Sequence, residues 1–148
     1  MVHIEIAKDL NKIDIRGMNR LLSQLDDNCE RIKLNDIQEI ISRDSLNLYL
    51  VHEDNQLAGF GILVWYKIIT GFKGWIEDVV IDQAFRGRRM GKILLLKMIE
   101  DGVKLGLEAV YLTSRPERII ANKLYQSLGF EKKDTNCFIL KLKSKGAV

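Results

Sequence analysis

A short basic turn that contains two glycines is the part of the sequence whose residue types and spacing best suit chemistry. It consists of Arg86, Gly87, Arg88, Arg89, Met90, Gly91 and Lys92. A strand pattern precedes it and a helix pattern follows it, so unpaired backbone N–H groups would meet an anion at the positive end of a helix dipole. Basic runs are often solvated faces, but this placement favours binding of a phosphate or pyrophosphate, with the cations adding charge.

Hydrophobic periodicity predicts the elements that lead to this turn. A strand and two helices come first, the second helix capped by Asn35, and a polar loop joins them. Three antiparallel strands then follow, of which the first two form a hairpin. In chain order we expect a strand over His3–Ile6, a helix from about Ile13 to Leu25, a loop over 26–33, a helix around Ile37–Ile41, and strands over Leu46–Val51, Leu57–Trp65 and Trp75–Ile81.

The pattern after the turn predicts a helix, a short buried strand, a last helix and a closing hairpin. These elements are a helix to about Leu105 ended by Gly106, a strand over Ala109–Thr113, a helix that carries Tyr125 and ends at Gly129, and a hairpin of Phe130–Lys133 with Asn136–Leu142. We expect the tail 143–148 to be frayed. The order predicts an α/β fold with a mixed sheet in a single domain over residues 1–148.

The segment from Trp75 to Lys92, WIEDVVIDQAFRGRRMGK, resembles motif A of the GNAT superfamily of N-acetyltransferases. The family pattern is Arg or Gln, any two residues, Gly, any residue, then Gly or Ala. Arg86 and Gly91 match its ends, whereas Arg89 stands at the middle glycine position. The segment 121–130 also resembles the family's motif B. The motif A segment is, in addition, similar to that of glucosamine-phosphate N-acetyltransferases.

The resemblance, which spans about residues 46–142, implies the GNAT fold: a mixed, splayed central sheet flanked by helices, whose opening admits the pantetheine of acetyl-CoA. Backbone groups of Val79, Val80 and Ile81 would bind this cosubstrate and polarise its thioester. Residues 86–92 would hold its phosphates, and Asn122 would contact it from the last helix. Taken alone, Asn122 is equally a polar residue on the solvent side of that helix. No metal is implied.

Two proton transfers are implied by the same resemblance. An amine must lose a proton before it attacks a thioester, and Glu77 is the candidate base, acting directly or through water. Asp78 is adjacent, would face the other side of a regular strand, and is a candidate for binding the substrate. In the family, a tyrosine at the position of Tyr125 often protonates the departing thiolate, which suits a phenol. Without the resemblance, Tyr125 reads as a core aromatic, and the acidic pair as an exposed edge or a salt-bridge partner.

Composition sets the limits on function. The chain has 148 residues, 47% hydrophobic and 29% charged, which is typical of a water-soluble globular domain. Its net charge of +3 is too small to imply nucleic acid. Cys29 and Cys137 make no disulfide framework, and the spacing of His3 and His52 supports no metal site. Apolar runs are shorter than the ~20 residues that span a bilayer, so we expect a cytoplasmic protein without membrane contact.

Several alternatives stay open at this level. The acceptor is a small-molecule amine, an amino acid, an amino sugar or a protein amine, and a homodimer is compatible with the sequence. A noncatalytic CoA-binding regulatory module would bind the cosubstrate without turnover. A nucleic-acid-binding protein would use the arginines of the turn, which lack interleaved aromatic residues. Trp65 and Trp75 read as packing anchors, although Trp75 could line an acceptor pocket.

Overall fold

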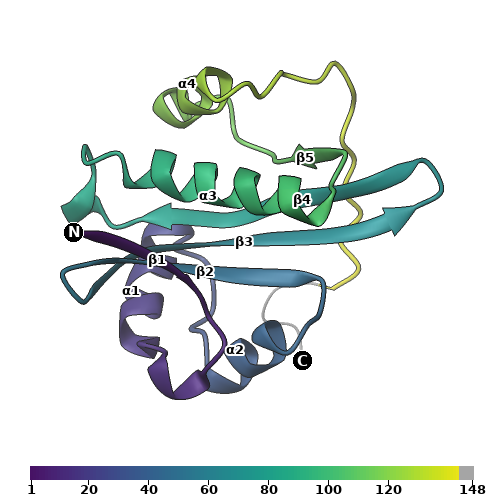
Figure 1. Ribbon diagram of the computed structural model, residues 1–148. Helices are drawn as coiled ribbons and strands as arrows, with labels where there is room; N and C mark the ends of the chain where they lie inside the picture. Colours follow the sequence, from purple (N-terminus) through teal and green to yellow (C-terminus); the bar gives the residue numbers. More distant parts are fainter. Residues whose placement is uncertain (144–148) are drawn as a thin grey trace. The chain divides into compact units, whose positions relative to one another are not determined.

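The computed structural model describes residues 1–143 (Figure 1). Two compact units make up the chain, residues 1–113 and 114–148. The first unit contains every strand of the described residues and three of their α-helices, and the second contains one α-helix.

A five-stranded mixed sheet forms the first unit, and its strands lie side by side in chain order. The first four strands pair with one another in antiparallel orientation, and the fifth pairs with the fourth in parallel orientation. This arrangement confirms the predicted α/β fold with a mixed sheet. The strands are β1 (Val2–Ile6), β2 (Leu46–Glu53), β3 (Gln56–Ile68), β4 (Gly71–Ile81) and β5 (Ala109–Tyr111).

The three helices of this unit begin and end at positions with recognisable local signals. They are α1 (Ile15–Leu25), α2 (Leu34–Ile41) and α3 (Met90–Leu105), with 3-10 turns η1 (Leu10–Lys12) and η2 (Gln83–Phe85). The carboxylate of Asp14 accepts the Gly17 N–H at 2.9 Å and caps α1. As predicted, α3 ends at Gly106, whose φ of 82° is the left-handed conformation that glycine adopts readily.

The predicted cap of α2 is wrong. Asn35 lies inside the helix, which begins at Leu34. Instead, the Asp36 carboxylate accepts the Lys33 N–H at 2.9 Å, as in the reciprocal half of a capping box. An acidic residue in the first turn thus accepts the N–H of the N-cap residue Lys33, which lies two residues before the predicted cap Asn35.

Helices cover both faces of the sheet (Figure 1). On one face, buried side chains of α1 and α2 pack with those of β2, β3 and β4: Met18, Leu21, Ile37, Leu48, Leu50, Phe60 and Val80. On the other face α3 approaches closely, since a Cβ atom on Gly61 would lie 2.7 Å from Cε of Met98. The hydroxyl of the fully buried Tyr49 donates to Asp101 of α3 at 2.8 Å. This contact fixes α3 on β2.

The second unit contains α4 (Ile119–Ser127), followed by Gly129 with φ of 98°. The predicted last helix is therefore confirmed. The predicted closing hairpin is wrong, because residues 130–142 form no strand. An isolated two-stranded hairpin is marginal in water, and alternating apolar residues cannot by themselves supply the further partner it needs. Of the predicted frayed tail, residues 144–148 lie outside the described part of the chain.

Candidate active site

A bulge interrupts β4 where the candidate acidic residues lie. In the register with β3, the single residue Gly61 lies opposite two residues, Asp78 and Val79. Asp78 has φ of 52°, a left-handed conformation that is uncommon outside glycine but several-fold enriched for aspartate. A bulge bends the strand and re-aims its side chains. The prediction that Asp78 faces away from Glu77 holds only for a regular strand, and β4 is irregular at this position.

The edge of β4 becomes available just before the bulge. Its parallel pairing with β5 covers only Lys73–Trp75, opposite Ala109–Tyr111. Within residues 1–143, no strand pairs with this edge of β4 from Ile76 onward. Backbone groups of Val79–Ile81 on this side are therefore not used by the sheet. This is the opening that a splayed sheet requires.

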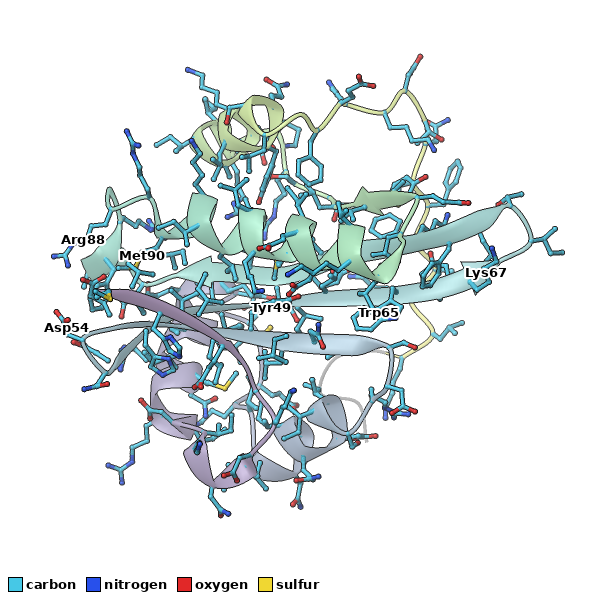
Figure 2. All side chains as sticks on the ribbon, viewed as in Figure 1. Tyr49, Asp54, Trp65, Lys67, Arg88 and Met90 are labelled. Carbon is cyan, nitrogen blue, oxygen red and sulfur yellow. The ribbon has the colours of Figure 1, made fainter. Side chains whose placement is uncertain are left out.

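The basic turn connects β4 to α3 and presents both charge and backbone donors. No side chain caps the N-terminus of α3, whose N-cap residue is Arg89, so its first N–H groups are available to an anion. Figure 2 labels Arg88 of this turn. Its guanidinium lies over the ring of Phe85, 5.4 Å from the ring centroid. Gly87 has φ of 80°, and a Cβ atom there would meet no heavy atom within 4 Å. The turn therefore leaves room for a ligand.

Arg89, which stands at the family's middle glycine position, has the backbone conformation of a glycine. Its φ is 62° and its ψ is 16°. A non-glycine residue in this region costs roughly 1–2 kcal/mol. The departure from the family pattern therefore changes the side chain while the path of the backbone is kept.

Two substitutions of Arg89 separate the effect of the backbone strain on stability from the effect of the guanidinium charge. We expect Arg89→Gly to change the free energy of unfolding by less than about 0.5 kcal/mol, because relief of strain offsets the larger entropy of the unfolded glycine chain. Arg89→Val removes the same charge but should cost about 1–3 kcal/mol, because a β-branched residue is strained at this φ. Urea denaturation measures both. Equal stability of the Gly and Val variants would contradict the assignment of strain to this position.

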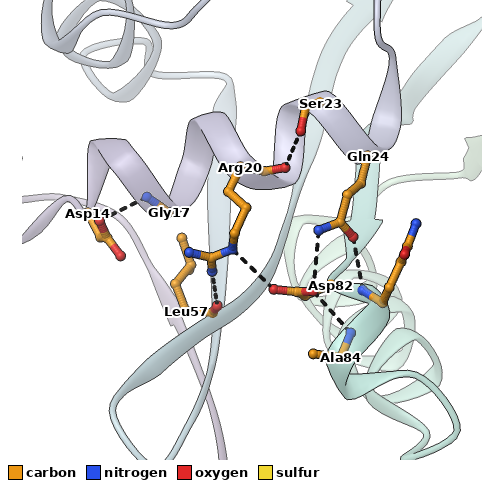
Figure 3. A network of polar contacts seen from close by, with 9 residues as sticks. Asp14, Gly17, Arg20, Ser23, Gln24, Leu57, Asp82 and Ala84 are labelled. Carbon is orange, nitrogen blue, oxygen red and sulfur yellow. Dashed lines mark hydrogen bonds and ion pairs between the residues drawn. The ribbon is translucent and has the colours of Figure 1, made fainter.

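A buried carboxylate holds the base of the turn to α1 (Figure 3). Asp82 is only 6% exposed. It accepts hydrogen bonds from Nε of Arg20 at 3.3 Å, Nε2 of Gln24 at 3.3 Å and the Ala84 N–H at 3.0 Å. The Gln24 side-chain oxygen in turn accepts the Gln83 N–H at 2.9 Å. Burial alone would raise the pKa of Asp82, but these hydrogen bonds outweigh it and lower the pKa, so the carboxylate stays charged.

The sequence pattern does not predict this network. Arg20 and Gln24 precede Asp82 by about sixty residues and lie on a helix whose pattern signals only its apolar face. The spacing of Arg20 and Gln24, one helical turn apart, was the one available signal that they share a face. Only the folded chain identifies their common partner.

Glu77 lies beside the bulge, and its pKa is raised above the ordinary value for glutamate. It pairs in register with Ile62, which packs against the core under α1 and α2, so Glu77 is on that face of the sheet. Burial raises the pKa of Glu77, and the negative charge of Asp78 raises it further. Burial also raises the pKa of Asp78. A carboxylate with a raised pKa is a stronger base than an ordinary glutamate, which suits proton abstraction near neutral pH.

The other two candidate residues, Asn122 and Tyr125, belong to the second unit. The Asn122 amide donates to the backbone carbonyl of Arg115 at 3.0 Å, so one of its donors closes the turn before α4. Tyr125 is 8% exposed, and its ring meets that of Phe130 edge-on at 6.0 Å. Both core packing and proton donation are compatible with this environment. The roles of both residues stay predictions.

Comparison with known proteins gives a family for these features. Residues 16–130 match the acetyltransferase (GNAT) family. The chain belongs to this family. It is 33% identical over 103 residues to glucosamine 6-phosphate N-acetyltransferase 1 of Oryza sativa subsp. japonica, covering 66% of this chain and 61% of the rice enzyme. It is 27% identical over 143 residues to aminoglycoside N(6')-acetyltransferase type 1 of Salmonella typhimurium, covering 87% and 99% of the two chains.

A solved structure of an aminoglycoside acetyltransferase, AAC(6')-Iy, shares the fold. It has a TM-score of 0.78 at 22% identity and covers 95% of this chain and 98% of its own. That protein was solved with a bisubstrate analogue that contains CoA. In this GNAT chain, the N-terminus of α3 is uncapped, Gly87 has no heavy atom within 4 Å of a Cβ position, and the β4 edge is unpaired from Ile76 onward within residues 1–143. No helix of residues 1–143 is long and apolar enough to cross a membrane.

Proposed function

We propose that this GNAT protein transfers the acetyl group of acetyl-CoA directly to a primary amine. The observation that carries the proposal is the end of the β4–β5 pairing at Trp75, which leaves an available edge of β4 beside the bulge and beside Glu77, whose pKa is raised. The same strand leads through Asp82 into the phosphate-binding turn. A binding surface for the cosubstrate and a base would therefore lie on one continuous segment of the first unit.

The residues that would hold acetyl-CoA act through charge and backbone. The side chains of Arg86, Arg88, Arg89 and Lys92 and the N–H groups at Met90 and Gly91 would bind its phosphates. Backbone groups of Val79, Val80 and Ile81 would hydrogen-bond the pantetheine arm along the edge of β4. Asn122 would add a contact from α4. When bound, acetyl-CoA supplies the activated thioester, and no metal is required.

Proton transfer falls to the side chains of this chain. Glu77, ionised above its pKa, would take the proton of the acceptor ammonium directly or through one water. Asp78 would bind the acceptor, placed by the left-handed turn of the bulge. Tyr125 would donate its hydroxyl proton to the departing sulfur, and its phenolate would regain a proton from the acylated nitrogen, which loses a second proton as it becomes an amide. Each assignment gives one side chain a distinct atom to act on, so each can be tested alone.

The phosphate-binding role of the turn predicts a loss of affinity that stability does not explain. The double variant Arg86→Ala/Arg88→Ala should weaken acetyl-CoA binding by about tenfold or more, because each charged hydrogen bond contributes about 1.5–3 kcal/mol before solvent screening. Isothermal titration calorimetry measures the dissociation constant. The control is Lys104→Gln, which removes an exposed cation at the far end of α3. Unchanged affinity in a folded double variant would remove the turn from the binding site.

A screen with diverse amines tests the function itself. The purified chain is incubated with acetyl-CoA and each amine, and the free CoA thiol is measured together with the mass of the acetylated product. We expect thiol release that depends on the amine and matches product formation. Binding of acetyl-CoA without turnover of any amine would instead favour a noncatalytic CoA-binding module. Failure to bind acetyl-CoA would overturn both.

A further inference from the structure

Three aromatic side chains from β3, β4 and β5 form a cluster where β4 and β5 part. Trp75 stacks on Tyr111, with ring centroids 5.2 Å apart and an interplanar angle of 24°. Nε1 of Trp75 donates a hydrogen bond to the Tyr66 hydroxyl at 2.9 Å. Both contacts fix the orientation of the indole. We call Tyr66, Trp75 and Tyr111 the aromatic cluster.

The aromatic cluster and Glu77 share one face of the sheet. Trp75 and Glu77 are two residues apart on β4, before the bulge, so their side chains point to the same side. The pair Trp75 and Tyr111 is also the last one that joins β4 to β5. The cluster therefore lies at the closed end of the opening, beside the candidate base. The Tyr66 residue is 40% exposed, so part of this surface can meet a ligand.

The positive charge of Lys73 accompanies the aromatic cluster. Nζ of Lys73 lies 5.0 Å from the ring centroid of Tyr111 and 5.9 Å from that of Tyr66. Such cation–π contacts hold an ammonium group over the rings while its N–H donors stay available. Lys73 takes part in none of the ion pairs found in the described part of the chain. Its charge is therefore available to an anion.

Charge along β4 changes sign over a short distance on this face. Lys73 and Glu77 are four residues apart, which corresponds to roughly 13 Å of extended strand. A ligand that spans them meets a cation at one end, aromatic rings in the middle and a carboxylate at the other end. That order matches an acceptor with an anionic group, a ring and an amine. A polycationic amine would instead place a second ammonium group near Lys73, at an electrostatic cost.

We propose that the aromatic cluster and Lys73 bind the acceptor, and that the acceptor is a ring-bearing primary amine with one anionic group, a phosphate or a carboxylate. This inference rests on the proposed acetyltransferase function. The ring packs on the cluster, the anion pairs with Lys73, and the amine reaches Glu77. The prepositioned indole and ammonium reduce the entropy lost on binding, since both are held before the ligand arrives. Lys73 is thus a specificity-determining residue.

Matched acceptors test the preference in the wild-type chain. Glucosamine 6-phosphate is compared with glucosamine, and 4-(aminomethyl)benzoate with benzylamine, so each pair differs by one anion that lies across the ring from the amine; kanamycin serves as the polycationic acceptor. We expect the anionic member of at least one pair to have kcat/KM about tenfold or more above its partner, as for one charged hydrogen bond. The pair that shows the difference distinguishes phosphate from carboxylate. Faster turnover of kanamycin or of both neutral members would overturn the proposal.

Variants then assign the preference to Lys73. Lys73→Met should remove the difference within the pair by raising KM for the anionic acceptor, while Lys73→Arg should keep it. The control is Lys67→Met, which removes a neighbouring exposed cation of β3 and should leave the difference intact. The dissociation constant of acetyl-CoA checks that each variant is folded, and it should not change.

The outcomes separate the two levels of the proposal. If Lys73→Met lowers turnover of both members of a pair equally, the acceptor assignment is wrong. If amines are acetylated with no preference for an anion, this inference fails and the acetyltransferase function stands. If no amine is acetylated, both the proposed function and this inference are wrong.

Discussion

The Glu77→Gln variant should transfer acetyl groups about 100-fold more slowly than the wild type at neutral pH, because a positioned base contributes at least that factor. Glutamine keeps the shape of the side chain but cannot accept the proton. Acetyl-CoA affinity, measured by calorimetry, should be nearly unchanged. Part of the loss should be recovered at higher pH, where more of the amine is already neutral. The matched control is Glu100→Gln, an exposed carboxylate of α3 that should keep full activity.

The pH profile gives the same assignment a second test. Glu77 acts as a base only when it is ionised, so kcat/KM should fall as the pH drops through its pKa. Because burial and the Asp78 charge raise that pKa, the fall should come at a higher pH than for an ordinary glutamate. Asparagine tolerates the left-handed backbone, so Asp78→Asn should keep the local structure. The variant removes the like charge beside Glu77 and should therefore shift the acidic fall of kcat/KM to lower pH. If Glu77→Gln has wild-type turnover at neutral pH, Glu77 is not the general base, and Asp78 or water takes the proton instead.

The Tyr125→Phe variant should also lose about 100-fold or more in kcat if the hydroxyl protonates the leaving thiolate. Phenylalanine keeps the ring and its edge-on contact with Phe130, so a purely structural role predicts little change in rate. Pre-steady-state kinetics should first establish that chemistry, not product release, limits turnover. The loss should shrink with an acyl donor whose thiol is more acidic, because that leaving group needs less protonation.

Stability provides the control for this variant. Thermal denaturation of Tyr125→Phe should show only a small shift, since nearly all of the apolar area stays buried. A folded variant with wild-type kcat under chemistry-limited conditions would return Tyr125 to a packing role. A large loss of rate that did not depend on the acidity of the thiol would likewise exclude proton donation to sulfur.

Local signals in the sequence were sufficient to predict much of the fold and the position of the basic turn of the candidate site. The ends of α3 and the position of the basic turn follow from a strand pattern, two glycines and an apolar helical stripe. These signals act within a few residues, so no tertiary context is needed to interpret them. Gly106 ends α3 in the predicted left-handed conformation for this reason. The family resemblance of residues 75–92 added the ligand that such a turn would bind.

These local signals do not predict which strands pair with each other, or in which register. Alternating apolar residues predicted a hairpin over residues 130–142, where the structure has none. The same kind of alternation does not show that β4 contains a bulge, because the bulge depends on the register with Gly61 of β3. A register shift of one residue reverses which face a side chain occupies. The orientation of Asp78 relative to Glu77 therefore could not be derived from spacing alone.

What the sequence by itself determined is thus the order of the elements as far as α4, the position of the basic, glycine-containing turn at residues 86–92 and the types of the side chains that are candidates for proton transfer. Only the tertiary structure decided which distant residues act together. Arg20 and Gln24 meet the buried Asp82, and Tyr66 and Tyr111 meet Trp75 beside Glu77. The physical reason is that these contacts depend on strand register and helix packing, which arise from many weak interactions across the whole sheet.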